Sequence, residues 1–311
     1  TFTGVITGTY EITPTLAGSK FVPRSYRLRI PPEQHDVNFL TLPENLKIPI
    51  ILIPGTGASI NNHCFFVSEI YCYFPELPLP NWPRFHWLLG ADVFAYGRLI
   101  GRLNDAGYKE RNGSFSVFFY DWRKPVASHD SELAAHIAKV KEQTGSPVVD
   151  IVGHSQGGLV ARSYIQHGGL DVRVLVLVGT PNRGTPVSYP YWQAGEVYNL
   201  GWGDPIVTAL VSEVFRRPLE SKAQAFRRVF PSFQDMLPTY DYLYDDGTAT
   251  VILEQDMQWR NKFLPELDAT IAALHARTGV LEIHSIGVNT TQRFFVQDRS
   301  TLDSFMSQWA D

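Results

Sequence analysis

Short apolar runs alternate with amphipathic helical segments through the middle of the chain, and this alternation constrains the fold more than any other feature. Four runs have the length and the Val and Ile content of strands buried on both faces. They cover residues 48–54, 115–120, 147–152 and 173–178. Apolar residues with helical spacing lie between them, at 93–103, 131–143 and 157–166. This order predicts an α/β fold, a mostly parallel sheet with helices on both faces.

Size and charge agree with one large α/β domain or a domain with a subdomain. By surface scaling, a 35.1 kDa chain exposes roughly 13,000 Å² when folded against about 51,000 Å² when unfolded, so about three quarters of its surface is buried. The 27 Lys and Arg against 31 Asp and Glu give a net charge of −4, which supplies no electrostatic basis for binding nucleic acid. No apolar run reaches the length of a membrane-spanning helix.

Two segments differ in composition from this pattern. Residues 1–47 form a β-rich leader that prolines interrupt. Residues 60–90 carry many aromatic residues and prolines without a helical or strand period. The second segment is typical of a lid over a site, and an excursion packed into the core is the alternative.

The segments after the fourth strand complete the predicted domain organisation. The core begins with residues 48–189, and residues 190–275, rich in Tyr, Trp and Pro, are predicted to form a helical cap inserted between strands of the sheet. Helical patches are expected at 205–215 and 258–277. The strand pattern returns at 281–288, and 292–296 is the expected partner of that strand. Residues 276–311 are therefore predicted to return to the core sheet.

The sequence Gly153-His-Ser155-Gln-Gly157 lies directly after one buried strand and directly before a helix. It matches the G-x-S-x-G turn, in which a sharp, strained bend lifts the serine hydroxyl above the sheet. The two flanking glycines are needed because neighbouring backbone comes too close for a side chain. The motif predicts that Ser155 is a nucleophile; a glycine-rich turn with a capping serine is the structural alternative.

A serine nucleophile of this type needs two backbone N–H donors for the developing oxyanion. The residue after the serine, Gln156, supplies the first donor, and the loop after an earlier strand supplies the second. That loop is Pro54-Gly55-Thr56-Gly57, and Thr56 is the candidate donor because Gly55 lets the backbone turn toward the site. The loop lacks the third glycine of a dinucleotide fingerprint and the Gly-Lys-Ser/Thr of a P-loop. A plain tight turn remains the alternative.

Five segments occur in a common order over about four fifths of the chain: residues 51–57, 119–123, 152–158, 179–185 and 231–238. Together they resemble the lecithin:cholesterol acyltransferase family of α/β-hydrolases, which includes lipase and phospholipase relatives. The resemblance implies an α/β-hydrolase core, a lid near the oxyanion loop, a cap before the last strands, and a Ser-Asp-His triad acting on lipid esters. It places the nucleophile on Ser155 and the oxyanion N–H groups on Thr56 and Gln156.

The two cysteines, Cys64 and Cys72, lie close together in a loop-like stretch. They could form a disulfide or be two free thiols. The resemblance implies a lid closed by a disulfide at this place, although the interval is shorter here. A disulfide favours an exported protein, so a secreted or extracytoplasmic location is expected. The partners expected with it are a lipid or ester substrate and a membrane or lipoprotein surface.

The acid and the base of the triad are not evident. The resemblance implies an acid after the strand expected at 281–288 and a histidine later still, but no histidine lies beyond His284. Asp311 is close to the expected acid position, so Asp311 and His284 are the in-chain candidates. His284 lies inside the strand pattern, which favours a structural role. We therefore expect that the C-terminal part was lost by truncation or processing, or is supplied by a separate chain.

These observations support one principal hypothesis, a serine carboxylic-ester hydrolase of the lipase, phospholipase or acyltransferase type that forms an acyl-enzyme at Ser155. In this hypothesis the aromatic segments 60–90 and 186–202 supply an apolar acyl pocket and a mobile lid. The first alternative is a non-catalytic binding module with this fold, and the second is a serine peptidase or amidase. No cofactor is expected. No metal is expected either, because His63, Cys64 and Cys72 lack the regular spacing of a zinc site.

Overall fold

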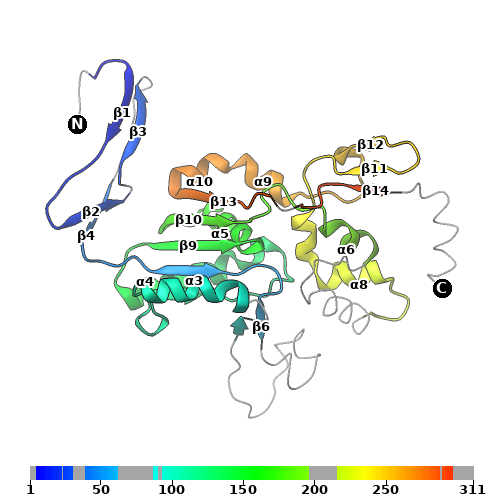
Figure 1. Cartoon of the computed structure of the whole chain (residues 1–311), viewed down its shortest axis with the longest axis horizontal. Helices are drawn as coiled ribbons and strands as arrows, with labels where there is room; N and C mark the ends of the chain where they lie inside the picture. The colour runs from blue at the N-terminus through cyan, green and yellow to red at the C-terminus, as the bar shows by residue number, and fades with distance from the viewer. Residues whose placement is uncertain are drawn as a thin grey trace, which may run out of the picture.

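The computed structural model describes residues 5–22, 24–30, 39–61, 87–89, 93–195, 216–287 and 289–296. Within them, the centre is a five-stranded sheet whose neighbouring strands all run parallel. The strands follow the order β13 (Gly279–Ile283), β10 (Val172–Val178), β9 (Val149–His154), β5 (Ile50–Ile53) and β8 (Phe115–Val117). The predicted α/β fold with a parallel sheet is confirmed (Figure 1).

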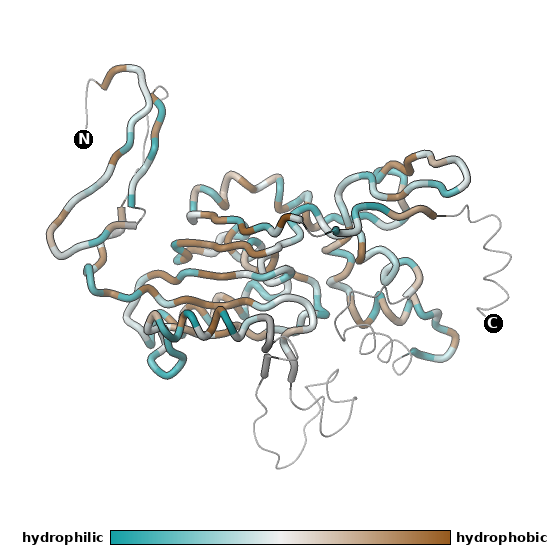
Figure 2. Tube along the Cα trace, in the orientation of Figure 1, coloured by the Kyte–Doolittle hydropathy of each residue, from teal (hydrophilic) through white to brown (hydrophobic). Residues whose placement is uncertain are grey.

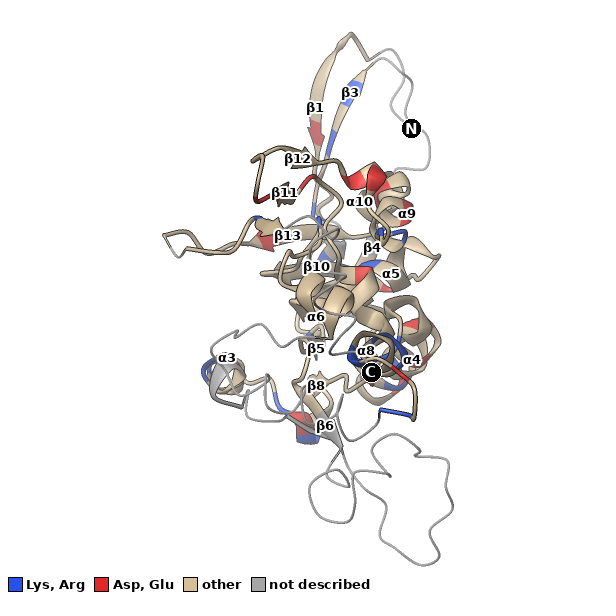
Figure 3. Ribbon diagram, turned by 90° about the vertical axis from the view of Figure 1, so that its right-hand side faces the viewer, with Lys and Arg blue, Asp and Glu red and all other residues tan. Residues whose placement is uncertain are grey.

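Helices cover both faces of this sheet because successive strand residues point to opposite sides. On β5, Ile51 and Ile53 pack into the large core cluster, whereas Leu52 packs into a second cluster on the other face. The three helices predicted between the strands are α3 (Val93–Asp105), α4 (Asp130–Thr144) and α5 (Gln156–Gln166). In the side view, α3 lies on one side of the sheet and both α4 and α5 lie on the other (Figure 3).

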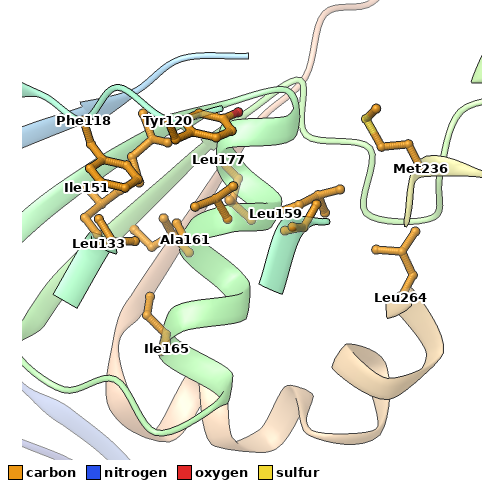
Figure 4. Close-up of a cluster of buried hydrophobic side chains, with 14 of the residues drawn as sticks. Phe118, Tyr120, Leu133, Ile151, Leu159, Ala161, Ile165, Leu177, Met236 and Leu264 are labelled. Carbon is orange, nitrogen blue, oxygen red and sulfur yellow. The ribbon is translucent and has the colours of Figure 1, made fainter. Parts of the chain in front are cut away.

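The core is centred on α5, which is buried along almost its whole length. Its residues Leu159 and Ile165 have no solvent exposure, and they share the cluster with Ile151 of β9 and Leu133 of α4 (Figure 4). The tube coloured by hydropathy shows the apolar residues gathered on the central strands (Figure 2). The helix that follows Ser155 is therefore a rigid support for it.

The strand expected at 292–296 does not pair with the last core strand, so that prediction is wrong. β14 (Phe294–Val296) runs parallel to β11 (Leu243–Asp245), and β12 (Val251–Ile252) flanks β11 on its other side. The strand expected at 281–288 is β13, which ends at Ile283. The chain then turns through Gly287, whose φ of 81° only glycine adopts readily. The Phe294 N–H donates to Tyr242 O at 2.8 Å and anchors the new pairing.

The segment expected as a cap contains several helices in its described part. α6 (Ser188–Ala194) packs against α8 (Lys222–Val229). α9 (Phe263–Ala269) and α10 (Ile271–Arg277) lie against α5. The sequence predicts one helix here, whereas the structure has two, which are separated at Thr270. The short 3₁₀ helices are η1 (Glu110–Asn112), η2 (Val126–His129), η3 (Pro231–Met236) and η4 (Glu254–Asp256). The helix expected at 205–215 lies outside the described residues.

Two smaller pairs of strands form the described N-terminal part. β1 (Gly8–Ile12) pairs with β3 (Tyr26–Ile30), and β2 (Ser19–Val22) pairs with β4 (Leu40–Pro43), both antiparallel.

The stretch predicted as a lid is described only at its ends. β6 (Ser59–Asn61) pairs with β7 (Trp87–Leu89), so these two ends lie side by side. Cys64 and Cys72 lie outside the described residues. No described helix has both the length and the apolar character that crossing a membrane requires.

Candidate active site

Ser155 lies at the sharp turn between β9 and α5, with φ 52° and ψ −126°. A positive φ is costly for a residue that carries a Cβ, and such strain is concentrated at functional sites. Two hydrogen bonds hold the turn. The Ser155 N–H donates to Val178 O at 2.9 Å, and the Gly158 N–H donates to Ser155 O at 3.0 Å. The strained serine predicted from the glycine spacing is therefore present in the structure.

The flanking glycines are required by the close approach of backbone. A Cβ on Gly157 would lie 2.3 Å from Ile53 O, and a Cβ on Gly153 would lie 2.6 Å from the Gly158 Cα. Real Cβ atoms do not come this close to backbone atoms, so each position excludes every other residue type. Gly157 lets α5 begin directly against the end of β5, and Gly153 lets it begin directly against β9.

The loop after β5 lies against the serine. A Cβ on Gly55 would be 2.9 Å from the Ser155 Cβ. The Gly55 N–H donates to the hydroxyl of Tyr96 on α3 at 2.9 Å, and that hydroxyl is 2.7 Å from His154 Nδ1. Since the Gly55 N–H has this partner, Thr56 remains the loop residue whose N–H is the candidate oxyanion donor.

Side chains connect the loop to the turn. Thr56 Oγ1 donates to Gln156 Oε1 at 2.9 Å, and Gln156 Nε2 donates to Trp122 O at 2.8 Å. Gln156 has no solvent exposure. As the first residue of α5, it also has a backbone N–H without an acceptor inside the helix. Sequence reasoning used only this N–H; the role of the side chain had no sequence signal.

A cavity of about 280 Å³ opens in front of Ser155. Thr56 and Gly57 contribute one side of it. Most of the other lining residues are apolar or aromatic: Trp122, Pro181, Val187, Tyr191, Phe233 and Met236. The sequence placed an apolar pocket in the segment that holds Val187 and Tyr191, but it missed Trp122, Phe233 and Met236.

Neither in-chain candidate for the acid and the base lines this cavity in the described structure. His284 is exposed and its Nε2 lies 3.0 Å from Glu282 Oε2 on β13. Asp311 lies outside the described residues. His154, beside the serine, is held by Tyr96. Among the described residues, no histidine or carboxylate lines the cavity, and no group of three His, Cys, Asp or Glu could hold a metal ion.

Asp235 lies beside Met236 in the chain and has a perturbed acidity. Burial raises its pKa to about 6, although the Val126 N–H, which donates to Asp235 Oδ2 at 2.8 Å, lowers it. This hydrogen bond connects η3, which holds Asp235, to the start of η2. Asp235 is therefore a support for the cavity wall and not one of its lining residues.

Curated relatives of the chain carry lipase names. A triacylglycerol lipase of Pseudarthrobacter phenanthrenivorans is 32% identical over 106 residues, which are 32% of this chain and 32% of that protein. A (lyso)-N-acylphosphatidylethanolamine lipase of Mus musculus is 27% identical over 167 residues, 51% of this chain and 47% of its own length. The chain thus spans only about a third to a half of the length of these relatives.

The chain is also similar to a solved structure at low sequence identity. The lipase BlEst2 of Bacillus licheniformis in its propeptide form is 15% identical, with a TM-score of 0.42, and the match covers 80% of this chain and 38% of that one. The model of the alpha/beta hydrolase family matches residues 50–287, which include the whole central sheet. The chain therefore belongs to the alpha/beta hydrolase family.

Proposed function

We propose that the chain is a serine carboxylic-ester hydrolase that acts on lipid esters, of the type found in the lecithin:cholesterol acyltransferase family. The observation that carries the proposal is the position of Ser155. It is strained to a positive φ at the start of α5, and it shares a largely apolar cavity with Thr56.

In the proposed reaction, Ser155 Oγ attacks the carbonyl carbon of the ester while a base takes its proton. The negative charge that develops on the carbonyl oxygen is stabilised by the N–H groups of Thr56 and Gln156 and by the N-terminal end of α5. The carbon–oxygen bond to the alcohol then breaks, and the alcohol leaves with the proton. Water attacks the acyl-enzyme and releases the acid. The same site supports transfer of the acyl group to a second alcohol.

The lining of the cavity supports an acyl chain as the bound group. Trp122, Tyr191 and Phe233 offer aromatic surface to an alkyl chain, and burying each methylene is worth about 0.8 kcal/mol. The lipase names of the curated relatives support the same substrate class. A membrane or lipoprotein surface as the working partner and an extracytoplasmic location belong to the proposal.

The proposal assigns the base and the acid to residues outside the described ranges or to a separate chain. In the described part, the ring nitrogens nearest the serine in sequence belong to His154, and its Nδ1 faces Tyr96. His284 is paired with Glu282 instead.

The direct test is turnover of a short-chain nitrophenyl ester together with labelling by a fluorophosphonate probe. Protein that includes the base should release nitrophenol and bind the probe covalently, and both signals should disappear in Ser155→Ala. This chain without its base should react only slowly with the probe, because the serine hydroxyl is a weak nucleophile until a base takes its proton. Ser131→Ala, at an exposed serine of α4, is the matched control and should keep both. Turnover that persists in Ser155→Ala would refute the proposal, and its absence from protein that includes the base would favour a non-catalytic binding module. Faster cleavage of peptide amides than of long-chain esters would favour an amidase.

A further inference from the structure

A second, larger cavity adjoins the one in front of Ser155. Its volume is about 560 Å³, and it shares two wall residues, Pro181 and Thr185, with the first cavity. The segment after β10 supplies one side of the cavity. The other side comes from the start of β11 and from the residues just before β14, two strands that lie side by side in Figure 1.

Two arginines from opposite sides of this cavity face it without an acidic partner. The Arg183 guanidinium lies 5.2 Å from the ring centre of Tyr240, and the Arg293 guanidinium lies 5.0 Å from that of Tyr244. In the described part of the chain, neither arginine is within ion-pair distance of a carboxylate. Stacking on an aromatic ring orients a guanidinium but leaves its N–H donors available.

The backbone that carries the arginines is fixed. The Thr239 N–H donates to Arg183 O at 3.1 Å, and the Thr185 N–H donates to Met236 O at 2.8 Å. Gly184 between them has a φ of 79°, and a Cβ there would lie 2.2 Å from Leu237 O. On the other side, parallel pairing of β14 with β11 sets the position of Arg293. The two positive charges are thus attached to ordered backbone rather than to a free loop.

Further donors line the same cavity. The hydroxyls of Thr185, Thr290 and Thr291 and the amide of Gln292 add to the two guanidinium groups. One carboxylate, Asp241, opposes them, and its Oδ1 accepts the Glu254 N–H at 2.6 Å. The formal charge of the lining residues is therefore +1. The two guanidinium groups and the hydroxyls provide more hydrogen-bond donors than one carboxylate can accept. This set of donors suits the three terminal oxygens of a phosphate group.

We propose that this cavity binds a phosphate group, so that Arg183 and Arg293 select esters that carry a phosphate near the scissile bond. The assignment of a phosphate-bearing ester as the substrate rests on the proposed function. The two cavities share Pro181 and Thr185, so the phosphate site lies next to the nucleophile. The same chemistry would hold free inorganic phosphate, and the experiments below separate the two sources.

Binding is measured first on the Ser155→Ala protein, so that the result does not depend on catalysis. Isothermal titration with glycerol 3-phosphate should give saturable binding. The Arg183→Gln/Arg293→Gln double variant should weaken it by about tenfold or more, as expected for charge-assisted hydrogen bonds. Arg111→Gln, at an exposed arginine of η1, is the matched control and should bind like the parent. Asp241→Asn should strengthen binding, and this gain keeps the test valid if the double variant does not fold.

Inorganic phosphate is the second ligand. Weaker binding than that of glycerol 3-phosphate indicates an organic phosphate as the ligand, and equal or tighter binding refutes selection of phosphate esters. Equal binding of either ligand to the parent and to a folded double variant overturns the whole inference, and so does weaker or unchanged binding in Asp241→Asn.

Turnover supplies the second measurement. Two soluble esters with identical short acyl chains are compared, a diacylglycerol phosphate and the corresponding diacylglycerol, both below their micelle concentrations. The ratio of kcat/KM for the phosphate ester to that for the neutral ester should fall about tenfold in the double variant and stay unchanged in Arg111→Gln. An unchanged ratio in the double variant refutes the selection. If neither ester is cleaved while glycerol 3-phosphate still binds through the arginines, the proposed function fails and the phosphate site stands.

Discussion

The hydroxyl of Thr56 donates a 2.9 Å hydrogen bond to the buried side-chain amide of Gln156. These two residues are also the candidates for the two oxyanion N–H donors, so one side-chain contact fixes the separation of two backbone groups. Preorganised donors stabilise a developing charge without reorganising during the reaction. The contact is therefore expected to affect the rate of the chemical step more than the binding of the ester.

Thr56→Val tests this contact. Valine keeps the shape and the backbone N–H but loses the donor to Gln156 Oε1, which leaves a buried acceptor without that partner. We expect kcat for a nitrophenyl ester to fall by about fivefold with little change in KM, since a neutral hydrogen bond is worth about 1 kcal/mol. Thr56→Ser retains the hydroxyl and should retain most of kcat. A rise in KM at constant kcat would contradict the positioning role.

Ser155 gives a second prediction, on stability. Its φ of 52° is costly for any residue with a Cβ and acceptable for glycine. Ser155→Gly should therefore be more stable than Ser155→Ala by about 1 kcal/mol, because about 1–3 kcal/mol of strain is relieved while glycine loses more entropy on folding. Urea unfolding of the two variants measures the difference. Ser155→Gly being the less stable variant would show that the turn is not strained.

The two glycine substitutions Gly157→Ala and Gly97→Ala should act in opposite directions. A methyl group on Gly157 would meet the carbonyl oxygens of Ile53 and Pro54 at 2.3 and 2.5 Å. We expect a loss of at least about 3 kcal/mol of unfolding free energy, because backbone must move. Gly97 lies inside α3, and apart from its chain neighbours and the backbone of its own helix no described atom lies within 4 Å of an added Cβ. Alanine there should stabilise by about 0.5–1 kcal/mol. Denaturant midpoints of both variants check the pair, and equal losses would contradict the assigned close approach.

The parts of the fold that could be predicted from the sequence are those that depend on neighbouring residues. The turn at Ser155 follows from glycines two positions away on either side, and the core strands follow from continuous apolar runs. The loop containing Thr56 was located because it directly follows such a run. Each of these signals lies within a few residues of the feature it predicts.

Contacts between distant residues could not be predicted in this way. Tyr96 reaches Gly55 and His154 across 41 and 58 residues, and nothing in its own surroundings marks it. The short apolar run at 294–296 fits a partner of β13 as well as a partner of β11. In the structure it pairs with β11 and not with β13. Such choices depend on tertiary packing, which one sequence does not encode in a local pattern.

The pH dependence of stability gives the last prediction. Burial, with a smaller contribution from Lys139, lowers the pKa of His136 from 6.5 to about 4. The unfolded chain binds a proton on this histidine at higher pH than the folded chain does. The contribution of His136 to the free energy of unfolding is therefore fully present above about pH 6.5 and is lost as the pH drops to about 4. Asp235 acts in the opposite direction. Burial raises its pKa from 3.8 to about 6. The contribution of its carboxyl to the free energy of unfolding is therefore fully present below about pH 4 and is lost as the pH rises to about 6.

Each shift corresponds to about 3 kcal/mol, so the two effects should nearly cancel between pH 4 and 6.5 in the wild-type protein. In Asp235→Asn, only His136 of these two groups still titrates. The unfolding free energy of this variant should fall steadily as the pH is lowered from 6.5 to 4. His136→Gln keeps a donor for Ser116, which lies 2.9 Å from His136 Nε2, and leaves only the carboxyl. Its unfolding free energy should rise over the same interval. Urea titrations at four pH values measure the slopes, and two variants with the same slope would contradict the assignment because the two groups must act with opposite sign.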